Sequence, residues 1–149
     1  MSVGHVMSKK VRATSATAPL SSLRRIFEES KFQHVPVIDS MHRLVGIVSV
    51  KDYYKALAPL IDSATGSTLD VFMQERKVQS VMTTPVISVK QHVAVLDAAE
   101  LLIRHNISAL PVVDDLQRLI GIVSWKDILR LVVVRQQQKR DRRHREEEE

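Results

Sequence analysis

The chain has 149 residues, 44% of them hydrophobic and 26% charged, and a formal net charge of +5, values that suit one globular domain. It contains no cysteine, which excludes disulfides, thiol nucleophiles and thiolate metal sites and favours a reducing compartment. The N-terminal residues lack the apolar core of a signal peptide, and no stretch approaches the roughly 20 apolar residues of a membrane span. We therefore expect a cytoplasmic protein without a membrane segment.

The first half of the chain predicts a helix, a hairpin and a second helix. Pro19 suits the first position of a helix. The apolar face of that helix would consist of Leu20, Leu23, Ile26 and Phe27. A polar turn at Asp39-Ser40 then separates two apolar runs, as in a β-hairpin. The second run, Leu44 to Val48, is typical of a strand covered on both faces, and another helix should begin near Ser49.

A linker is expected over residues 58–77. The stretch from Ser63 to Ser67 is typical of a turn or a flexible segment. The segment from Thr68 to Arg76 favours a short helix capped by Ser67 or Thr68.

The second half predicts a strand followed by the same helix, hairpin and helix. Val86 to Val89 is a short β-branched run and reads as the strand. Apolar residues then recur at helical spacing at Val95, Ala98, Ala99, Leu102 and Ile103. A turn at Asp114-Asp115 leads into the second strand of the hairpin, Leu119 to Val123, and the last helix should begin near Ser124.

The charged end of the chain, residues 135–149, mixes both signs. Five basic residues between Lys139 and Arg145 are followed at once by Glu146 to Glu149. We expect a solvated, frayed and disordered tail. The alternative is that the basic cluster contacts an acidic partner.

The two halves are copies of each other at an offset of 75 residues. From Pro36 to Asp52, eleven of seventeen positions are identical to those from Pro111 to Asp127. Residues 3–11 align with residues 78–86 at the same offset of 75, and the alignment needs no gap. One unit of about 55 residues would bury too little surface to be stable alone, so the two copies should pack as one domain.

The doubled motif is an apolar-Pro-Val-apolar-Asp stretch, a short turn, and Gly-apolar-apolar-Ser-x-x-Asp ahead of a helix. This pattern resembles the tandem cystathionine-β-synthase-type (CBS) domain pair, also called a Bateman module. The resemblance implies an α/β fold in which two β-α-β-β-α repeats, residues 3–57 and 78–134, pack with pseudo-twofold symmetry. It also implies two ligand clefts, regulatory binding of AMP, ADP, ATP or S-adenosyl compounds, and frequent homodimerisation.

Carried onto this sequence, the family's binding residues form two sets. Ser49 with Asp52, and Ser124 with Asp127, would contact ribose or phosphate, and Ser88 corresponds to a further polar contact. Val86, Ile87 and Leu110 would hold the adenine. Because Ala13 stands where the second repeat has Ser88, we expect the cleft of Ser88, Ser124 and Asp127 to be the better nucleotide site. On this reasoning Asp127→Ala should weaken binding more than Asp52→Ala.

Structural explanations compete with several of these assignments. Ser-x-x-Asp at a helix start also matches a capping box. Gly46 and Gly121 could admit a phosphate, but close packing within a strand is the favoured interpretation. The six histidines lack metal-ligand spacing, so no metal is expected. Glycine-rich phosphate loops and nucleophile elbows are absent, which argues against an enzyme.

The sequence therefore predicts a regulatory module that binds an adenosine nucleotide, without a covalent cofactor, and signals to an effector protein whose identity is unknown. The alternative is a dimerisation or assembly module with vestigial clefts. Binding of nucleic acid through the basic tail is a third reading, disfavoured because the chain has few aromatic residues for base stacking.

Overall fold

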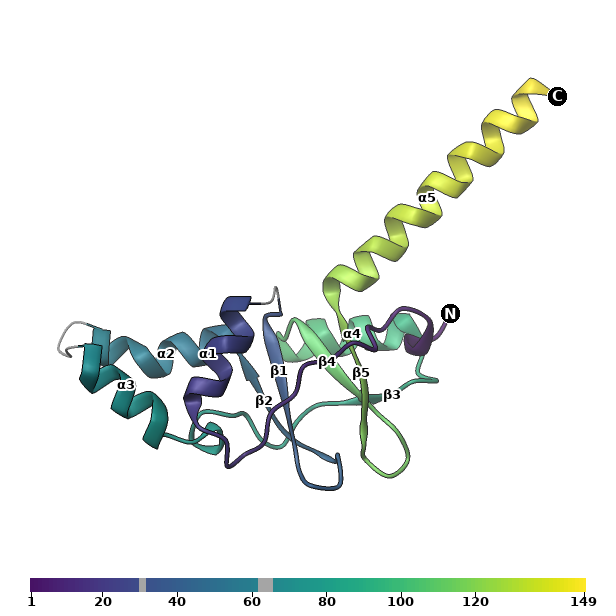
Figure 1. Ribbon diagram of the computed structural model, residues 1–149. Helices are drawn as coiled ribbons and strands as arrows, with labels where there is room; N and C mark the ends of the chain where they lie inside the picture. The colour runs from purple at the N-terminus through teal and green to yellow at the C-terminus, as the bar shows by residue number, and fades with distance from the viewer. Residues whose placement is uncertain (30–31, 62–65) are drawn as a thin grey trace.

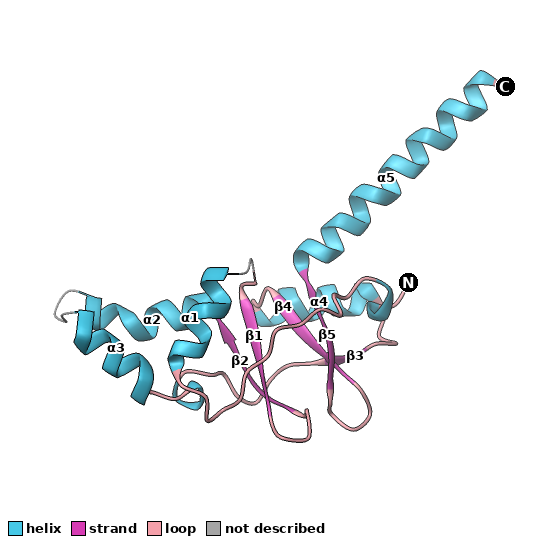
Figure 2. Ribbon diagram, viewed as in Figure 1, coloured by secondary structure: helices cyan, strands magenta, loops and turns pink. Residues whose placement is uncertain are grey.

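The computed structural model describes residues 1–29, 32–61 and 66–149 (Figure 1). The first half contains a 3-10 turn at Val3–His5 and then α1 (Leu20–Glu29), β1 (His34–Ile38), β2 (Leu44–Ser49) and α2 (Val50–Ile61). Helix α3 (Gly66–Glu75) follows. The second half contains a 3-10 turn at Val78–Ser80 and then β3 (Val89–Lys90), α4 (Val95–His105), β4 (Ala109–Val113), β5 (Leu119–Ser124) and α5 (Trp125–Glu148). This order confirms the predicted α/β fold of two repeats (Figure 2).

Two antiparallel hairpins, β1-β2 and β4-β5, form the centre of the molecule. The carboxylate of Asp39 organises the first hairpin turn, because it accepts hydrogen bonds from the backbone amides of Met41 and Arg43 at 2.9 Å. The guanidinium of Arg43 also donates to Asp39, at 2.8 Å. Asp114 makes the same contacts with Leu116 and Arg118 in the second turn. The polar turn residues seen in the sequence therefore set the hairpin geometry.

The two hairpin turns meet on a pseudo-twofold axis. The amide of Leu44 donates to the carbonyl of Gln117, and the amide of Leu119 donates to the carbonyl of His42, both at 3.0 Å. Between them lies a bridge from Arg43 to Arg118, two residues that are themselves related by the offset of 75. Contacts that map onto one another in this way confirm the predicted symmetry.

The first residues of each repeat cross over and pack into the core of the other repeat. Val3 is fully buried among residues of the second repeat, which include Val89, Ala98 and Leu110. Its counterpart Val78 is fully buried among residues of the first repeat. Matching backbone bonds hold the two segments, from Val3 to the carbonyl of Val93 at 2.8 Å and from Val78 to the carbonyl of Ala18 at 2.9 Å. Neither core is complete without the other repeat.

The two strand glycines, which recur at the offset of 75 residues, lie where the crossing segments pack. A Cβ atom on Gly46 would lie 2.5 Å from the sulfur of Met82, and one on Gly121 would lie 2.6 Å from the sulfur of Met7. Met82 and Met7 pack against the first and second cores, respectively. The packing interpretation of the two glycines is confirmed.

Two predictions about local structure differ from the observed fold. Of the run from Val86 to Val89, Val89 alone joins a strand, because Thr83, shortly before the run, is bonded to Ile47 of the first repeat and the chain reaches β4 at Val89. The predicted turn at 63–67 lies mostly outside the described residues, and α3 begins at Gly66, so Ser67 and Thr68 lie within the helix and not ahead of it.

The charged tail also differs from its prediction, because α5 continues as a helix to Glu148 (Figure 1). Residues 135–148 are rich in Gln, Lys, Arg and Glu, which favour helix. Polar neighbours at helical spacing add to this, as His144 and Glu147 do with their side chains 3.9 Å apart. Among the helices of the described ranges, none is long and apolar enough to span a bilayer.

Candidate functional site

The Ser-x-x-Asp motifs form capping boxes at the starts of α2 and α5. Asp52 donates its amide to the hydroxyl of Ser49 at 3.1 Å, and the amide of Ser49 donates to the Asp52 carboxylate at 3.3 Å. Ser124 and Asp127 repeat the arrangement at 3.4 and 2.8 Å. The capping interpretation is confirmed, and it fixes both carboxylates at a helix start, where they are partly buried.

The two aspartates differ in how many of their oxygens are engaged. In Asp127, the carboxylate oxygen that accepts the Ser124 amide also accepts from the Ser124 hydroxyl, at 3.1 Å. The other carboxylate oxygen accepts from Arg130 at 3.4 Å. In Asp52, only one oxygen is used by the residues that the structure describes. Asp52 therefore retains a free acceptor for a ligand.

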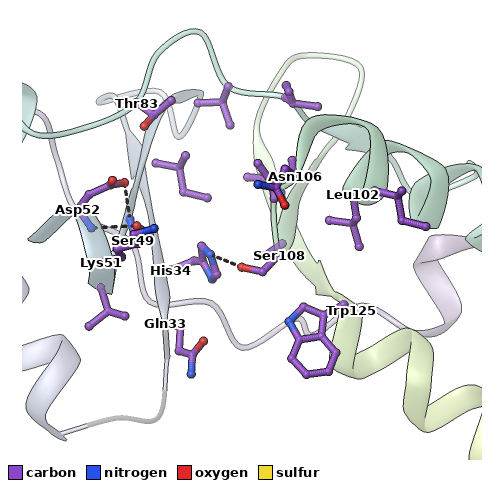
Figure 3. A pocket seen from close by; sticks show the side chains of 18 of the residues that line it. Gln33, His34, Ser49, Lys51, Asp52, Thr83, Leu102, Asn106, Ser108 and Trp125 are labelled. Atoms are coloured by element: carbon purple, nitrogen blue, oxygen red, sulfur yellow. Dashed lines mark hydrogen bonds between the residues drawn. The ribbon is translucent and has the colours of Figure 1, made fainter.

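The larger cavity of the molecule lies at Asp52 and has a volume of about 790 Å³. From the first repeat it is lined by the polar residues Gln33, His34, Ser49, Lys51 and Asp52. From the second it is lined by Thr83, Val86, Ile87 and the end of α4, including Leu102 and Asn106. Figure 3 shows Asp52, Ser49 and Lys51 on one side of this cavity and Leu102 on the opposite side. We call it the Asp52 cleft.

A smaller cavity of about 270 Å³ lies at Asp127. We call it the Asp127 cleft. Its charged lining consists of Lys126, Asp127 and Arg130. It shares Gln33, His34, Ser108, Ala109 and Trp125 with the Asp52 cleft, so the two cavities are neighbours separated by a common wall.

The two cavities divide the site residues differently from the grouping predicted from the sequence. Val86 and Ile87 line the Asp52 cleft and not the Asp127 cleft, whereas Ser88 lines neither cavity and Leu110 is fully buried in the second core. Ser124 and Asp127 do lie together, in the smaller cavity. The expected preference for a cleft of Ser88, Ser124 and Asp127 thus loses its structural basis.

The crossing of the segments places Val86 and Ile87 of the second repeat in the cleft of the first-repeat Asp52. Thr83 is joined to Ile47 of β2 by reciprocal backbone hydrogen bonds at 2.8 and 3.2 Å. Residues 83–87 consequently run beside the first repeat and bring Val86 and Ile87 to Asp52. Ser8 makes the equivalent pair with Ile122, at 2.8 and 3.0 Å, and lines the Asp127 cleft. At Thr14 the segment has already reached the first repeat, where its amide donates to the carbonyl of Pro36 at 3.0 Å, and Ala13 lines neither cleft.

A hydrogen bond between the repeats forms the wall between the clefts. The Nε2 atom of His34 and the hydroxyl of Ser108 are 2.9 Å apart (Figure 3). Burial lowers the pKa of His34, although the nearby Asp52 carboxylate raises it. The imidazole is therefore held toward its neutral form, which can accept or donate at the Ser108 hydroxyl.

Sequence analysis missed His34, Ser108 and Thr83 as candidate site residues. His34 corresponds to Ala109 and Gln33 to Ser108 at the repeat offset, so the wall does not follow the internal symmetry. Thr83 had a detectable signal, since the offset pairs it with Ser8 and thereby places a hydroxyl in the same position of both repeats. Within the described ranges, no cluster of three or more His, Asp or Glu residues could hold a metal ion.

Duplicated hairpins, crossed N-terminal segments and a cleft at each Ser-x-x-Asp motif define a CBS domain pair. The family model for the CBS domain matches residues 3–59 and 78–134, and the chain belongs to this family.

Curated relatives include an enzyme of much greater length. The chain is 34% identical to a homoserine O-acetyltransferase of Methanococcoides burtonii over 131 residues, which cover 88% of this chain but 24% of that protein. It is 33% identical to an uncharacterized protein of Methanocaldococcus jannaschii, with 73% of this chain and 78% of the relative covered. The chain thus spans about a quarter of the acetyltransferase.

Solved structures share the fold over nearly the whole chain. The CBS domain pair of protein MJ0100, in complex with 5′-methylthioadenosine and S-adenosyl-L-methionine, has a TM-score of 0.75 at 28% identity, covering 91% of this chain and 98% of that one. CBSX2 of Arabidopsis thaliana in complex with AMP has a TM-score of 0.77 at 25% identity, with the same coverage. Adenosine compounds are therefore bound by two structural neighbours of this chain.

Proposed function

We propose that the chain is a regulatory module that binds an adenosine nucleotide or nucleoside in the Asp52 cleft. The observation that carries this proposal is Asp52, which lines a cavity of about 790 Å³ with polar and apolar residues and uses one carboxylate oxygen in its hydrogen bonds with the described residues. Cavities of about 300–1,000 Å³ with a few placed polar groups are typical of small-ligand sites. The adenosine compounds bound by MJ0100 and CBSX2 support the choice of ligand.

The chemistry of the cleft suits a nucleoside. The Asp52 carboxylate can accept hydrogen bonds from the two vicinal hydroxyls of a ribose, because it presents acceptors only. Val86 and Ile87 on the far segment provide an apolar surface for the adenine ring. The Asp127 cleft is the weaker candidate, since Arg130 already occupies its carboxylate and its volume is about 270 Å³.

The regulatory role includes a partner that responds to the ligand, while the module itself performs no catalysis. One wall of the Asp52 cleft comes from the first repeat and the other from the second. A ligand that bridges the two walls therefore favours one arrangement of the repeats over others. An effector protein that contacts the module would sense that arrangement. We place this activity in the cytoplasm, as expected from the cysteine-free composition.

A second candidate function, dimerisation or assembly, is favoured by one observation. Apolar side chains on the first half of α5 are half exposed, at 52% for Leu129, 52% for Val132 and 55% for Val133. A second copy of the chain could cover this surface. Sedimentation velocity with and without ligand would measure the dimer. A dimer that forms in a protein unable to bind any adenosine compound would favour assembly as the main function.

Two matched variants test the binding proposal. Asp52→Asn and Asp127→Asn each keep an oxygen for the capping box and remove one charge, and Asp127→Asn additionally weakens the exposed contact with Arg130. Loss of a charged hydrogen-bond partner should weaken binding of AMP to Asp52→Asn by about 10- to 100-fold. Asp127→Asn should bind as the wild type does. Isothermal titration calorimetry measures both, and equal affinities in the two variants would reject the Asp52 cleft as the site.

A further inference from the structure

The charged groups of the Asp52 cleft are few. Of the described residues that line it, only Lys51 and Asp52 carry a formal charge, so their contributions cancel. We infer that this cleft selects adenosine compounds whose 5′ substituent carries little negative charge, such as a thioether nucleoside or a monophosphate, over ADP and ATP. This inference rests on the proposed function of the cleft and specifies its ligand class.

The cation available to a phosphate is a single exposed lysine. Lys51 lies in the first turn of α2 with its side chain exposed to solvent, where a charge is screened. His34 adds no charge near neutral pH, because burial lowers its pKa. A triphosphate would bring about four negative charges to this site, and only one of them could be balanced.

The backbone donors at the start of α2 are also partly used. The amide of Val50 donates to the carbonyl of Gln33 at 2.8 Å, and the amide of Asp52 donates to the hydroxyl of Ser49 at 3.1 Å. The helix start therefore lacks two of the donors that would otherwise bind a chain of phosphates.

Basic residues of the neighbouring cleft do not supply the missing charge. Arg130 is paired with Asp127 at 3.4 Å, and the ammonium of Lys126 lies 5.9 Å from the ring centroid of Trp125. Both residues line the Asp127 cleft and neither lines the Asp52 cleft. The hydrogen bond between His34 and Ser108 lies in the wall between them.

The second repeat lines the cleft mainly with apolar residues, among them Val86, Ile87, Leu102 and Ile107, and its polar lining residues Thr83, Asn106 and Ser108 are uncharged. An uncharged 5′ group can contact such a surface, whereas a phosphate chain would lose hydration there without gaining a cationic partner. Charge and hydrophobicity thus favour the same ligand class.

Calorimetric titration of the full chain with 5′-methylthioadenosine, AMP, ADP and ATP, without Mg²⁺ and at fixed ionic strength, tests the inference. We expect 5′-methylthioadenosine and AMP to bind at least about tenfold more tightly than ATP. Lys51→Ala should weaken AMP severalfold and leave 5′-methylthioadenosine unchanged, and the matched variant Lys126→Ala should change neither.

The possible failures are distinguishable. Affinity that rises from AMP to ATP, or a Lys51→Ala variant that weakens all ligands equally, would overturn the charge selection and leave the binding function in place. Absence of binding by all four compounds would overturn the proposed function itself, and the selection with it.

Discussion

Substituting the two strand glycines with alanine tests the contact between each hairpin and the segment that crosses onto it. In Gly46→Ala, the new Cβ would lie 2.5 Å from the sulfur of Met82, and its three nearest atoms all belong to that flexible side chain. In Gly121→Ala, the Cβ would lie 2.6 Å from the sulfur of Met7 and 3.0 Å from the backbone oxygen of Ser8. A backbone atom cannot move aside as a methionine can.

The magnitudes follow from this difference. Overpacking of a core costs about 1–3 kcal/mol, and we place Gly46→Ala near the lower limit and Gly121→Ala near the upper limit. The Ser8 oxygen also accepts the amide of Ile122 at 3.0 Å, so any displacement of residue 8 strains that bond. For a chain of this size, the difference should appear as a melting point lower by several degrees in Gly121→Ala.

Urea unfolding at equilibrium measures both variants, and a double-mutant cycle assigns the cause. Combining Gly46→Ala with Met82→Ala should recover about 1 kcal/mol relative to the sum of the single effects, because the clash is removed. If Gly121→Ala proved as stable as Gly46→Ala, or the cycle showed no coupling, the described packing of the crossing segments would be incorrect.

Three further predictions concern burial and titration. Val3→Ala should lower the free energy of unfolding by about 2 kcal/mol in urea melts, because it removes two buried methyl groups, while the control Val71→Ala, at a position 53% exposed, should have little effect. The pKa of Asp39 is lowered by hydrogen bonds from the backbone and side chain of Arg43. The contribution of this carboxylate to stability is therefore fully present above its pKa in the unfolded chain, near 3.9, and is lost as the pH falls through its lower pKa in the folded protein. The stability difference between wild type and Asp39→Asn should therefore shrink below about pH 4 in unfolding titrations, and a constant difference would contradict this assignment. Burial lowers the pKa of His34, so the unfolded state gains its proton first, and stability should fall as pH drops below about 6.5. His34→Gln should show a smaller loss between pH values of about 8 and 5, and an unchanged loss would count against the neutral buried imidazole.

The sequence predicted most of the fold because the relevant signals are local. The turn at Asp39 and its copy at Asp114 marked both hairpins, and the Ser-x-x-Asp motifs marked the helices that start at Val50 and Trp125. These features depend on residues a few positions apart, so pattern reading captures them.

The arrangement of the clefts was not predictable in the same way. At an offset of 75 residues the two repeats have equivalent sequences. The sequence pattern of a segment is therefore the same whether the segment packs on its own repeat or on the other one. Contacts such as the pairings of Thr83 with Ile47 and of Ser8 with Ile122 decide the question, and they join residues far apart in the chain. His34 was missed for a related reason, because its partner Ser108 has no counterpart at the equivalent position.

The crossed segments impose an order of events during synthesis of the chain. The first repeat cannot close its core until Val78 has left the ribosome, and Val3 must wait for Val123, one of the last core residues to be made. Until then the apolar side chains of Val3, Val6 and Met7 have no native site to occupy. Residues 3–7 are thus translated well before Val123 but dock only after it, and their apolar side chains remain vulnerable to misassociation during that interval.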